Sequence, residues 1–402
     1  MALLSQRIQK VKPSATLQIT AKAKEMRAAG QDVIGLGAGE PDFDTPDHIK
    51  KAAVKALKDG FTKYTAVGGI PELKSAIIKK YKKDNNLKYE ADQIVVTVGG
   101  KQAFYNMAQA MLDAGDEVII PAPYWVSYPD MVLLADATPV IVETKEDNGL
   151  KMVPEELKKA LTKNTKMVVI NSPSNPTGSA YTADELFALG EVLKDYPNVY
   201  VVSDDIYERI VYDDFEHFTF AEACPELKDR AIILNGVAKA YSMTGWRIGY
   251  AAGPVEIIKA MTKIQSQSTS CATSFAQVAA ATAIGGSQKC IKPMVKAFRK
   301  RRDFVVKTLN NIPGITCLTP EGAFYVYPNV GGLIGKKTAD GKVIENTIDL
   351  AAYLLESKGV ALVPGSAFGL DPYVRISFAT SMADLKEALK RINSVAKELV
   401  GK

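Results

Sequence analysis

The stretch RAIILNGVAKAYSMTGWRIGY, residues 230–250, joins a short apolar run to a loop that holds one lysine and one arginine near its end. The run AIIL has the length of a buried strand and ends in small residues. Lys239 follows within a few residues, and its glycine, valine and alanine neighbours place its stem against the core. Desolvation lowers the pKa of an amine and makes it a nucleophile for carbonyl compounds. The stretch therefore predicts a strand that leads to a Schiff-base lysine; the alternative is an ordinary surface lysine.

Four further apolar runs of strand length occur before this one, and each also ends in small or polar residues. Amphipathic helical patterns lie between or before the runs, at residues 71–86, 101–114 and 183–194. This alternation predicts an α/β fold with a mostly parallel sheet and helices on both of its faces. Such sheets bind ligands beyond the carboxyl ends of their strands, so chemistry is expected there. The four runs are QIVVTVGG (93–100), DEVIIPAP (116–123), TKMVVINSP (165–173) and VYVVSDD (199–205).

The pattern changes after about residue 290. A long charged helix is expected over residues 292–311, followed by short strand-like pieces and a final helix from Met382. We expect a large domain over residues 46–295, a smaller α+β domain over 296–402, and an N-terminal segment, 1–45, that packs with the smaller domain. With no long linker between them, the site is expected in the cleft between the domains.

Composition and charge exclude several classes of protein. The 50 basic and 45 acidic residues give a net charge of +5, too little for a nucleic-acid or membrane-surface protein of 402 residues. The four cysteines, at 224, 271, 290 and 317, have neither metal-site nor disulfide-framework spacing. No metal is expected, and the absence of a signal peptide or long apolar run predicts a cytoplasmic protein.

Two glycine-rich stretches resemble nucleotide-binding motifs but fail them. GLGAGEPDF (35–43) has Glu40 where a dinucleotide fingerprint needs its third glycine or alanine, and GGLIGKKT (331–338) is one residue short of a P-loop. Neither stretch supports nicotinamide binding or nucleotide hydrolysis.

Seven segments, taken in order along the chain, resemble the motifs of class I aminotransferases. GVAKAYSMTGWRIG (236–249) is similar to the family's pyridoxal-phosphate lysine signature, with Lys239 as the lysine. The resemblance implies a pyridoxal 5'-phosphate enzyme of fold type I that acts as a homodimer with shared active sites on amino acids and 2-oxo acids. The other six segments are AGEPDFDTP (38–46), KYTAVGGIPELK (63–74), PYWVSYP (123–129), NSPSNPTG (171–178), SDDIYE (203–208) and VRISFATS (374–381).

The resemblance implies roles for side chains around the cofactor ring. Asp204, at a strand end, would pair with the ring nitrogen and keep it protonated, although a helix cap is the alternative for such an aspartate. Tyr207 and the amide of Asn175 would reach the ring 3-oxygen; taken alone, they read as a core tyrosine and a turn. Trp125 would stack on the ring, or else serve as a core residue between the domains.

The cofactor phosphate needs positive charge and N–H donors. Gly99, Gly100 and Lys101 precede a helix and offer its N-terminus to an anion. By resemblance, Arg247 adds a bidentate contact, and Tyr64 reaches the phosphate of the neighbouring subunit. Some relatives have a phosphate-binding serine at Gly236, and whether Ser242 takes its place is open.

The substrate assignment also rests on the resemblance. Arg375 would hold the α-carboxylate, with Asn175 and the backbone of Gly39 beside it, whereas an ordinary salt bridge is the alternative. Lys239 would move a proton from the substrate Cα. The favoured activity is amino transfer between L-aspartate and 2-oxoglutarate, with prephenate as a possible further substrate. An aromatic or prephenate-preferring aminotransferase, a lyase on the same fold and an inactive regulator are the alternatives. The proposed distal-carboxylate groups are Ser14, Thr16 and Lys101, with Lys12 for prephenate or as part of a solvated tail.

Overall fold

A seven-stranded sheet forms the centre of the computed structural model, which describes residues 3–401. The strand order is β2-β8-β7-β6-β5-β3-β4, and every neighbouring pair is parallel except those that involve β8. The mostly parallel sheet predicted from the apolar runs is confirmed, and each quoted run forms a strand. The strands are β2 (Ile94–Thr97), β3 (Glu117–Ala122), β4 (Thr138–Glu143), β5 (Thr165–Asn171), β6 (Tyr200–Asp204), β7 (Ala231–Gly236) and β8 (Gly249–Ala252).

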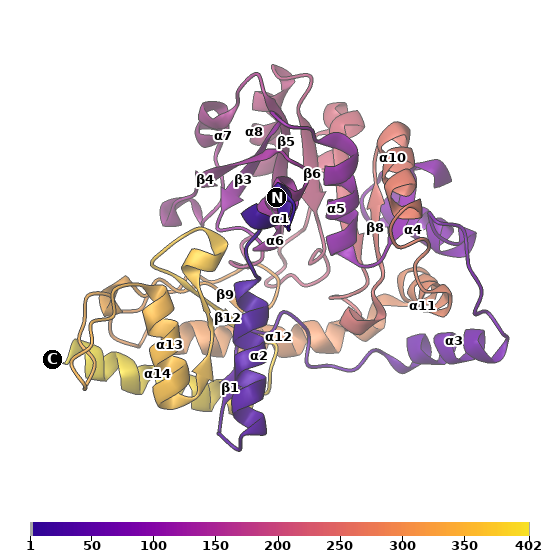
Figure 1. Cartoon of the computed structure of the whole chain (residues 1–402). Helices are drawn as coiled ribbons and strands as arrows, with labels where there is room; N and C mark the ends of the chain where they lie inside the picture. The colour runs from indigo at the N-terminus through magenta and orange to yellow at the C-terminus, as the bar shows by residue number, and fades with distance from the viewer. Residues whose placement is uncertain (1–2, 402) are drawn as a thin grey trace.

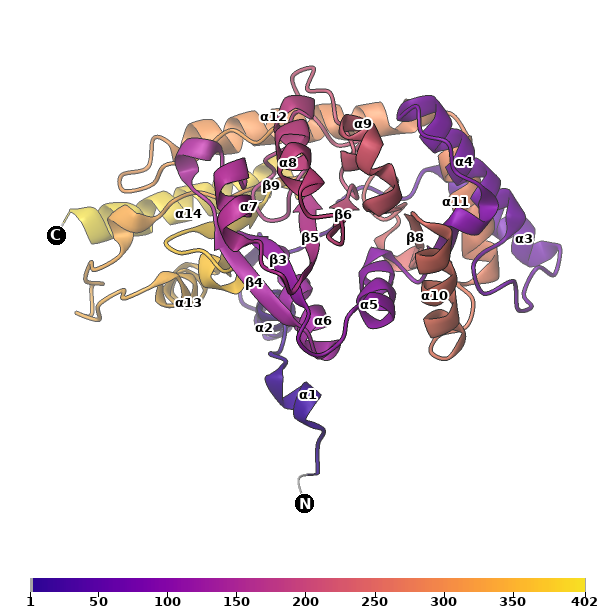
Figure 2. The same ribbon diagram turned by 90° about the horizontal axis from the view of Figure 1, so that it is seen from above.

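Both faces of the sheet are buried along its central strands, which explains why these strands are apolar without alternation. Successive residues of β7 show the pattern: Ile232 and Leu234 belong to one apolar cluster, and Ile233 belongs to the other. Helices cover the two faces, as the view from above shows (Figure 2). One cluster includes side chains of α5 (Gly100–Met111), α6 (Ser127–Leu134) and α10 (Val255–Ser266), and the other those of α4 (Pro71–Asp84), α8 (Ala183–Lys194) and α11 (Ser274–Gly285).

The C-terminal part of the chain forms a separate lobe beside the sheet (Figure 1). It contains a three-stranded antiparallel sheet of β9 (Tyr325–Val326), β11 (Val363–Pro364) and β12 (Val374–Ser377). The N-terminal segment joins this lobe, because β1 (Ile34–Gly35) pairs with β10 (Val360–Ala361). The helices of this region are α2 (Ala15–Ala28), α13 (Thr347–Lys358) and α14 (Met382–Val400).

A long helix, α12 (Ile291–Leu309), runs along both parts of the molecule (Figures 1 and 2). The boundary predicted at residue 295 falls inside this helix, so the division into domains stays a prediction. The remaining helices are α1 (Gln6–Lys10), α3 (Asp47–Lys58), α7 (Pro154–Ala160) and α9 (Phe220–Ala223). Within residues 3–401, no helix has the length and hydropathy needed to cross a membrane.

Backbone hydrogen bonds join loops of the central sheet to the C-terminal lobe around the place where the site is expected. The N–H of Tyr124, just beyond β3, donates to the carbonyl of Phe368 at 3.0 Å, and the N–H of Gly322 donates to that of Gly178, in the loop after β5, at 2.8 Å. The loops at the carboxyl ends of the parallel strands therefore contact the C-terminal lobe. This is the edge at which open α/β sheets bind ligands.

Candidate active site

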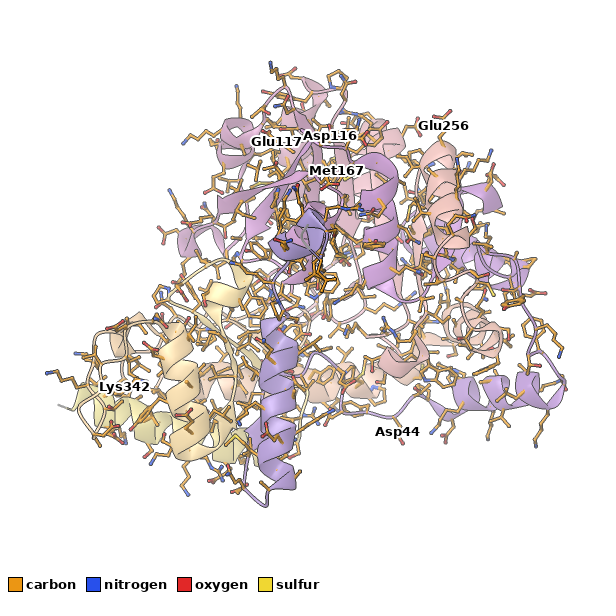
Figure 3. All side chains as sticks on the ribbon, viewed as in Figure 1. Asp44, Asp116, Glu117, Met167, Glu256 and Lys342 are labelled. Carbon is orange, nitrogen blue, oxygen red and sulfur yellow. The ribbon has the colours of Figure 1, made fainter. Side chains whose placement is uncertain are left out.

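A cavity of about 250 Å³ lies where the strands β5, β6 and β7 end and β12 approaches from the other lobe. In Figure 3, Asp116, Glu117 and Met167 mark the opposite, amino-terminal edge of the sheet, far from the labelled Lys342 of the C-terminal lobe. The predicted residues that line the cavity are Ser14, Thr16, Gly39, Gly100, Lys101, Trp125, Asn175, Asp204, Tyr207, Lys239, Arg247 and Arg375. Twelve residues that are scattered through the sequence thus meet in one place.

The amine of Lys239 enters this cavity from the loop that follows β7. Its Nζ donates a hydrogen bond of 2.6 Å to the carbonyl of Gly39. Burial, together with the positive charges of Arg375 and Arg247, lowers the pKa of Lys239 to about 8, against the opposite effects of Glu40 and Asp204. The pKa shift has the direction that the sequence predicts, so an appreciable fraction of this amine is neutral near pH 7 to 8.

Asp204 ends β6 and faces the same cavity. Its carboxylate accepts a hydrogen bond of 2.5 Å from the hydroxyl of Tyr128 and one of 3.3 Å from the N–H of Ile206. Burial raises the pKa of Asp204, whereas these two hydrogen bonds and the charge of Lys239 oppose the rise. Tyr128 comes from the first turn of α6, inside the motif PYWVSYP, and the sequence argument did not single it out.

Tyr207 and Asn175 connect the two lobes at the cavity. The hydroxyls of Tyr207 and Tyr325 are 2.9 Å apart, and Tyr325 comes from β9 of the C-terminal lobe. The side-chain oxygen of Asn175 accepts a hydrogen bond of 2.8 Å from Arg375, and its backbone N–H donates to Asn171. Both predicted residues therefore lie in the cavity; Arg375 was expected beside Asn175, whereas Tyr325 was not identified as a partner of Tyr207.

Arg375 is buried, with only 2% of its surface exposed, and it forms no ion pair within the described residues. Besides its contact with Asn175, it donates to the carbonyl of Gly37 at 2.6 Å, whereas its Nε is buried with no partner in residues 3–401. Burial lowers its pKa, and the partial compensation comes from tyrosines rather than carboxylates. A planar carboxylate is the ligand that an unpaired, buried guanidinium fits best.

Glycines allow a basic side chain to lie against the N-terminus of α5. Gly99, the N-cap, has φ +83°, and a Cβ atom built on it would lie 2.3 Å from the guanidinium of Arg247. A Cβ on Gly249 would likewise lie 2.4 Å from the backbone nitrogen of Gly100. Arg247 and the free N–H groups of the first helical turn thus form a cationic corner suited to a phosphate.

Some predicted residues lie apart from the cavity wall. Tyr64 is 91% exposed, and the backbone N–H of Lys12 donates to Asp130 at 3.4 Å, while neither side chain lines the cavity. The hydroxyl of Ser242 donates to the sulfur of Met294, and Ser242 does not line the cavity. The single chain therefore does not bring these three side chains to the site.

Comparisons with known proteins agree with this geometry. A family model described as "Aminotransferase class I and II" matches residues 31–392. The chain belongs to this family. It is 54% identical to an aspartate/prephenate aminotransferase of Nitrosomonas europaea (98% of this chain, 99% of the relative) and 57% identical to one of Cereibacter sphaeroides (98% of each).

Solved structures of aspartate aminotransferases have the same fold as this chain. The chain superposes on an aspartate aminotransferase of Rhizobium meliloti with a TM-score of 0.96 at 50% identity, over 99% of this chain and 100% of that one. For an aspartate aminotransferase of Thermus thermophilus with maleate, the TM-score is 0.92 at 43% identity, over 98% and 100% of the two chains. This aminotransferase therefore has the predicted fold type I, and its cofactor is pyridoxal 5'-phosphate.

The chemistry of the residues that line the cavity fits that cofactor. Arg247 and the start of α5 offer a phosphate site, Asp204 is a buried acid, and Lys239 is an amine of lowered pKa. The indole of Trp125 forms part of the wall, with the ammonium of Lys101 5.1 Å from its ring. Several lining residues were not predicted: Ser127, Tyr128, Asn171 and Ile206, which lie inside the quoted motifs, Asn235, which directly precedes one, and Leu17 and Tyr325, which lie in none of them.

The pKa of Lys239 predicts how the cofactor-free protein captures pyridoxal phosphate. Only the neutral amine attacks an aldehyde, so the rate should rise with pH and level off above a midpoint near 8. An exposed lysine would show a midpoint near 10.4. Stopped-flow absorbance over a pH series measures the rate, and a midpoint above about 10 would contradict the assigned environment of Lys239.

Proposed function

We propose that this aminotransferase moves an amino group between L-aspartate and 2-oxoglutarate in a ping-pong cycle. The observation that carries the proposal is Arg375, a buried guanidinium without a carboxylate partner in the described residues, in the same cavity as Lys239. Lys101, Ser14 and Thr16 line that cavity as well and could bind a second carboxylate. Relatives named for aspartate support the choice of a dicarboxylic amino acid.

The proposed roles follow from the contacts of each side chain. Arg375 binds the α-carboxylate as a bidentate partner, with Asn175 beside it and the backbone of Gly39 close to Lys239. Lys239 removes the proton from the substrate Cα and would deliver it to the C4′ carbon of bound pyridoxal phosphate, not back to Cα. Bound pyridoxal phosphate supplies the electron sink that stabilises the charge left at this carbon.

Other residues hold the cofactor in the proposal. Asp204 pairs with the ring nitrogen, Tyr207 and Asn175 donate to the ring 3-oxygen, and Trp125 stacks on the ring. The contact with Tyr128 helps to keep Asp204 oriented. The phosphate is bound by Gly99, Gly100, Lys101 and Arg247, and by Tyr64 of the partner subunit. The cytoplasmic location stays a prediction.

Replacement of the lysine tests the central assignment. Lys239→Ala should keep the fold and bind pyridoxal phosphate, but its turnover of aspartate with 2-oxoglutarate should fall by at least about 10²- to 10⁴-fold, the contribution of a positioned acid–base group. Oxaloacetate formation is measured in a coupled assay, with the exposed Lys259→Ala on α10 as control. Substantial turnover by Lys239→Ala would remove the proposed chemistry.

The preference for aspartate is tested at Lys101. Loss of a charge-assisted hydrogen bond costs about 1.5 to 3 kcal/mol, so Lys101→Ala should lower kcat/KM for aspartate about 10- to 100-fold more than that for alanine or phenylalanine. A general effect of the substitution on the cationic corner would lower kcat/KM for all three amino acids alike, so the comparison between substrates corrects for it. Equal losses for all three amino acids would assign the distal carboxylate to a different residue.

A second candidate substrate is prephenate, favoured by relatives named aspartate/prephenate aminotransferase. The backbone of Lys12 contacts Asp130, which places this segment beside α6 at the cavity. In this proposal the ammonium of Lys12 meets the additional carboxylate. The test compares the rates with prephenate and with oxaloacetate as amino acceptors in one assay. Similar rates would indicate an enzyme for both substrates, a rate with oxaloacetate alone a strict aspartate enzyme, and a faster rate with prephenate an enzyme that prefers prephenate.

We also propose a homodimer with shared sites. Besides Tyr64, the apolar side chains of Val54, Leu57 and Phe61 on α3 and the loop after it are exposed in the single chain, at 49%, 44% and 39%. A second copy on this surface would bury them and bring Tyr64 of the partner subunit to the phosphate.

Mixed dimers test the sharing. After unfolding and refolding together, equal amounts of inactive Lys239→Ala and Tyr64→Ala should regain about a quarter of wild-type activity, because half the dimers are mixed and each holds one intact site. Lys239→Ala mixed with Arg247→Ala should regain none, since both residues belong to the same subunit's site. Recovery in the second mixture, or none in the first, would contradict shared sites of this kind.

A further inference from the structure

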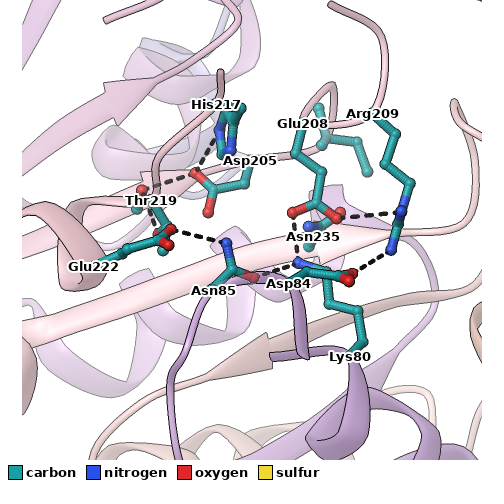
Figure 4. A network of polar contacts seen from close by, with 12 residues as sticks. Lys80, Asp84, Asn85, Asp205, Glu208, Arg209, His217, Thr219, Glu222 and Asn235 are labelled. Carbon is teal, nitrogen blue, oxygen red and sulfur yellow. Dashed lines mark hydrogen bonds and ion pairs between the residues drawn. The ribbon is translucent and has the colours of Figure 1, made fainter. Parts of the chain in front are cut away.

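The turn that follows β6, residues 204–209, has one face toward the active site and one face away from it. Asp204 and Tyr207 line the cavity, whereas Glu208 and Arg209 belong to a polar network on the other side (Figure 4). The turn forms no ladder with a strand beyond Asp204, and its backbone is held by single hydrogen bonds such as that from Asp205 to the carbonyl of Leu234, at 2.9 Å. Its side chains must therefore supply much of its anchoring.

Two ion pairs attach the far face of this turn to α4. The Nζ of Lys80 lies 2.5 Å from the carboxylate of Glu208, and the guanidinium of Arg209 lies 2.5 Å from the carboxylate of Asp84. Lys80 and Asp84 are four residues apart on the helix, so both side chains project from the same face. Consecutive residues of the turn thus meet successive turns of α4.

The Lys80–Glu208 pair is deeply buried and well satisfied. The two side chains are 3% and 11% exposed, and Lys80 also donates to the side-chain oxygen of Asn85 at 2.9 Å. Asn85 in turn donates to Glu222 at 3.0 Å. Burial alone would raise the pKa of Glu208, but the charges of Lys80, Arg209 and His217 outweigh burial and lower it.

Such a pair is an inefficient way to stabilise a fold. Two apolar side chains of similar volume often stabilise a core equally well or better, whereas removal of one partner alone leaves a buried charge and destabilises the protein strongly. An ion pair does impose direction and distance, which apolar contacts do not. Residues that act on a bound group must be held to within about 0.5 Å.

We propose that α4 positions Asp204 and Tyr207 through the Lys80–Glu208 ion pair, with Asp84–Arg209 as a second attachment. Lys80 and Glu208 are then positioning residues for amino transfer, although neither side chain lines the cavity. On the opposite side, the contact between the hydroxyls of Tyr207 and Tyr325 limits the movement of the same turn. The inference rests on the proposed roles of Asp204 and Tyr207.

The test compares three variants: Lys80→Met, Glu208→Leu and the double variant. The affinity of cofactor-free protein for pyridoxal phosphate is measured by the fluorescence of its two tryptophans, Trp125 and Trp246, and stability by the urea midpoint. Each single variant should lower the midpoint and the affinity. The double variant should recover the midpoint, because no charge remains unpaired, yet its affinity and its kcat with aspartate should stay at least about tenfold below wild type, with KM for aspartate little changed.

The control is the Lys151–Glu185 pair, which has the same 2.5 Å contact but joins a loop to α8 and is more exposed, at 14% and 41%. The double replacement Lys151→Met with Glu185→Leu should leave cofactor affinity at the wild-type value. Binding is measured without urea, on protein that circular dichroism shows to be folded. The affinity of the Lys80→Met, Glu208→Leu double variant for pyridoxal phosphate therefore decides the outcome, whatever the urea midpoint of that variant. Wild-type affinity and kcat in that protein would overturn the positioning role. Failure of the wild-type chain to bind pyridoxal phosphate would instead count against the proposed function.

Discussion

A guanidinium buried without a carboxylate partner in residues 3–401 is the constraint on which the rest of the site depends. Arg375 is held by the carbonyl of Gly37, the amide of Asn175 and the rings of Tyr325 and Phe368, whose centroids are 4.6 and 4.9 Å away. Neutral partners compensate only part of the cost of removing a charge from water. The folded chain therefore contains a cation that a carboxylate ligand would complete, and its four partners come from four separate parts of the sequence.

The same positive charge acts on the reactive amine. Arg375 and Arg247 both lower the pKa of Lys239, after burial itself, so the groups that bind anions also help to keep the amine neutral. Anions bound at these arginines would weaken this effect and favour the protonated amine. Substrate binding and proton transfer are thus connected by electrostatics as well as by contact.

Backbone geometry explains why the cationic corner can form at all. The antiparallel strand β8 places Gly249 against the start of α5, where a Cβ would overlap the backbone of Gly100. Arg247 precedes this strand with φ +56°, a left-handed conformation that costs free energy for an arginine. The strain and the close packing occur together at the proposed phosphate site, where precise placement matters most.

The sequence by itself determined the sheet strands that carry the site and the identity of most lining residues. Every quoted apolar run became a strand, and the helix expected at 183–194 was found at those residues, because hydrophobic periodicity and local capping signals act over a few residues. The strand β4 (TPVIVE) was not among the predicted strands; it lies at the edge of the sheet, and none of its residues is fully buried. Motifs similar to those of the family supplied Lys239, Asp204 and Arg375.

Only the tertiary structure decided which side chains support these residues. Tyr128 contacts Asp204 across 76 residues of sequence, Tyr325 contacts Tyr207 across 118, and Lys80 contacts Glu208 across 128. No local pattern marks a tyrosine that donates to a distant carboxylate, or a lysine whose partner lies on another element. Such pairs depend on how strands and helices pack, since a hydrogen bond requires its two atoms within about 3 Å and correctly oriented.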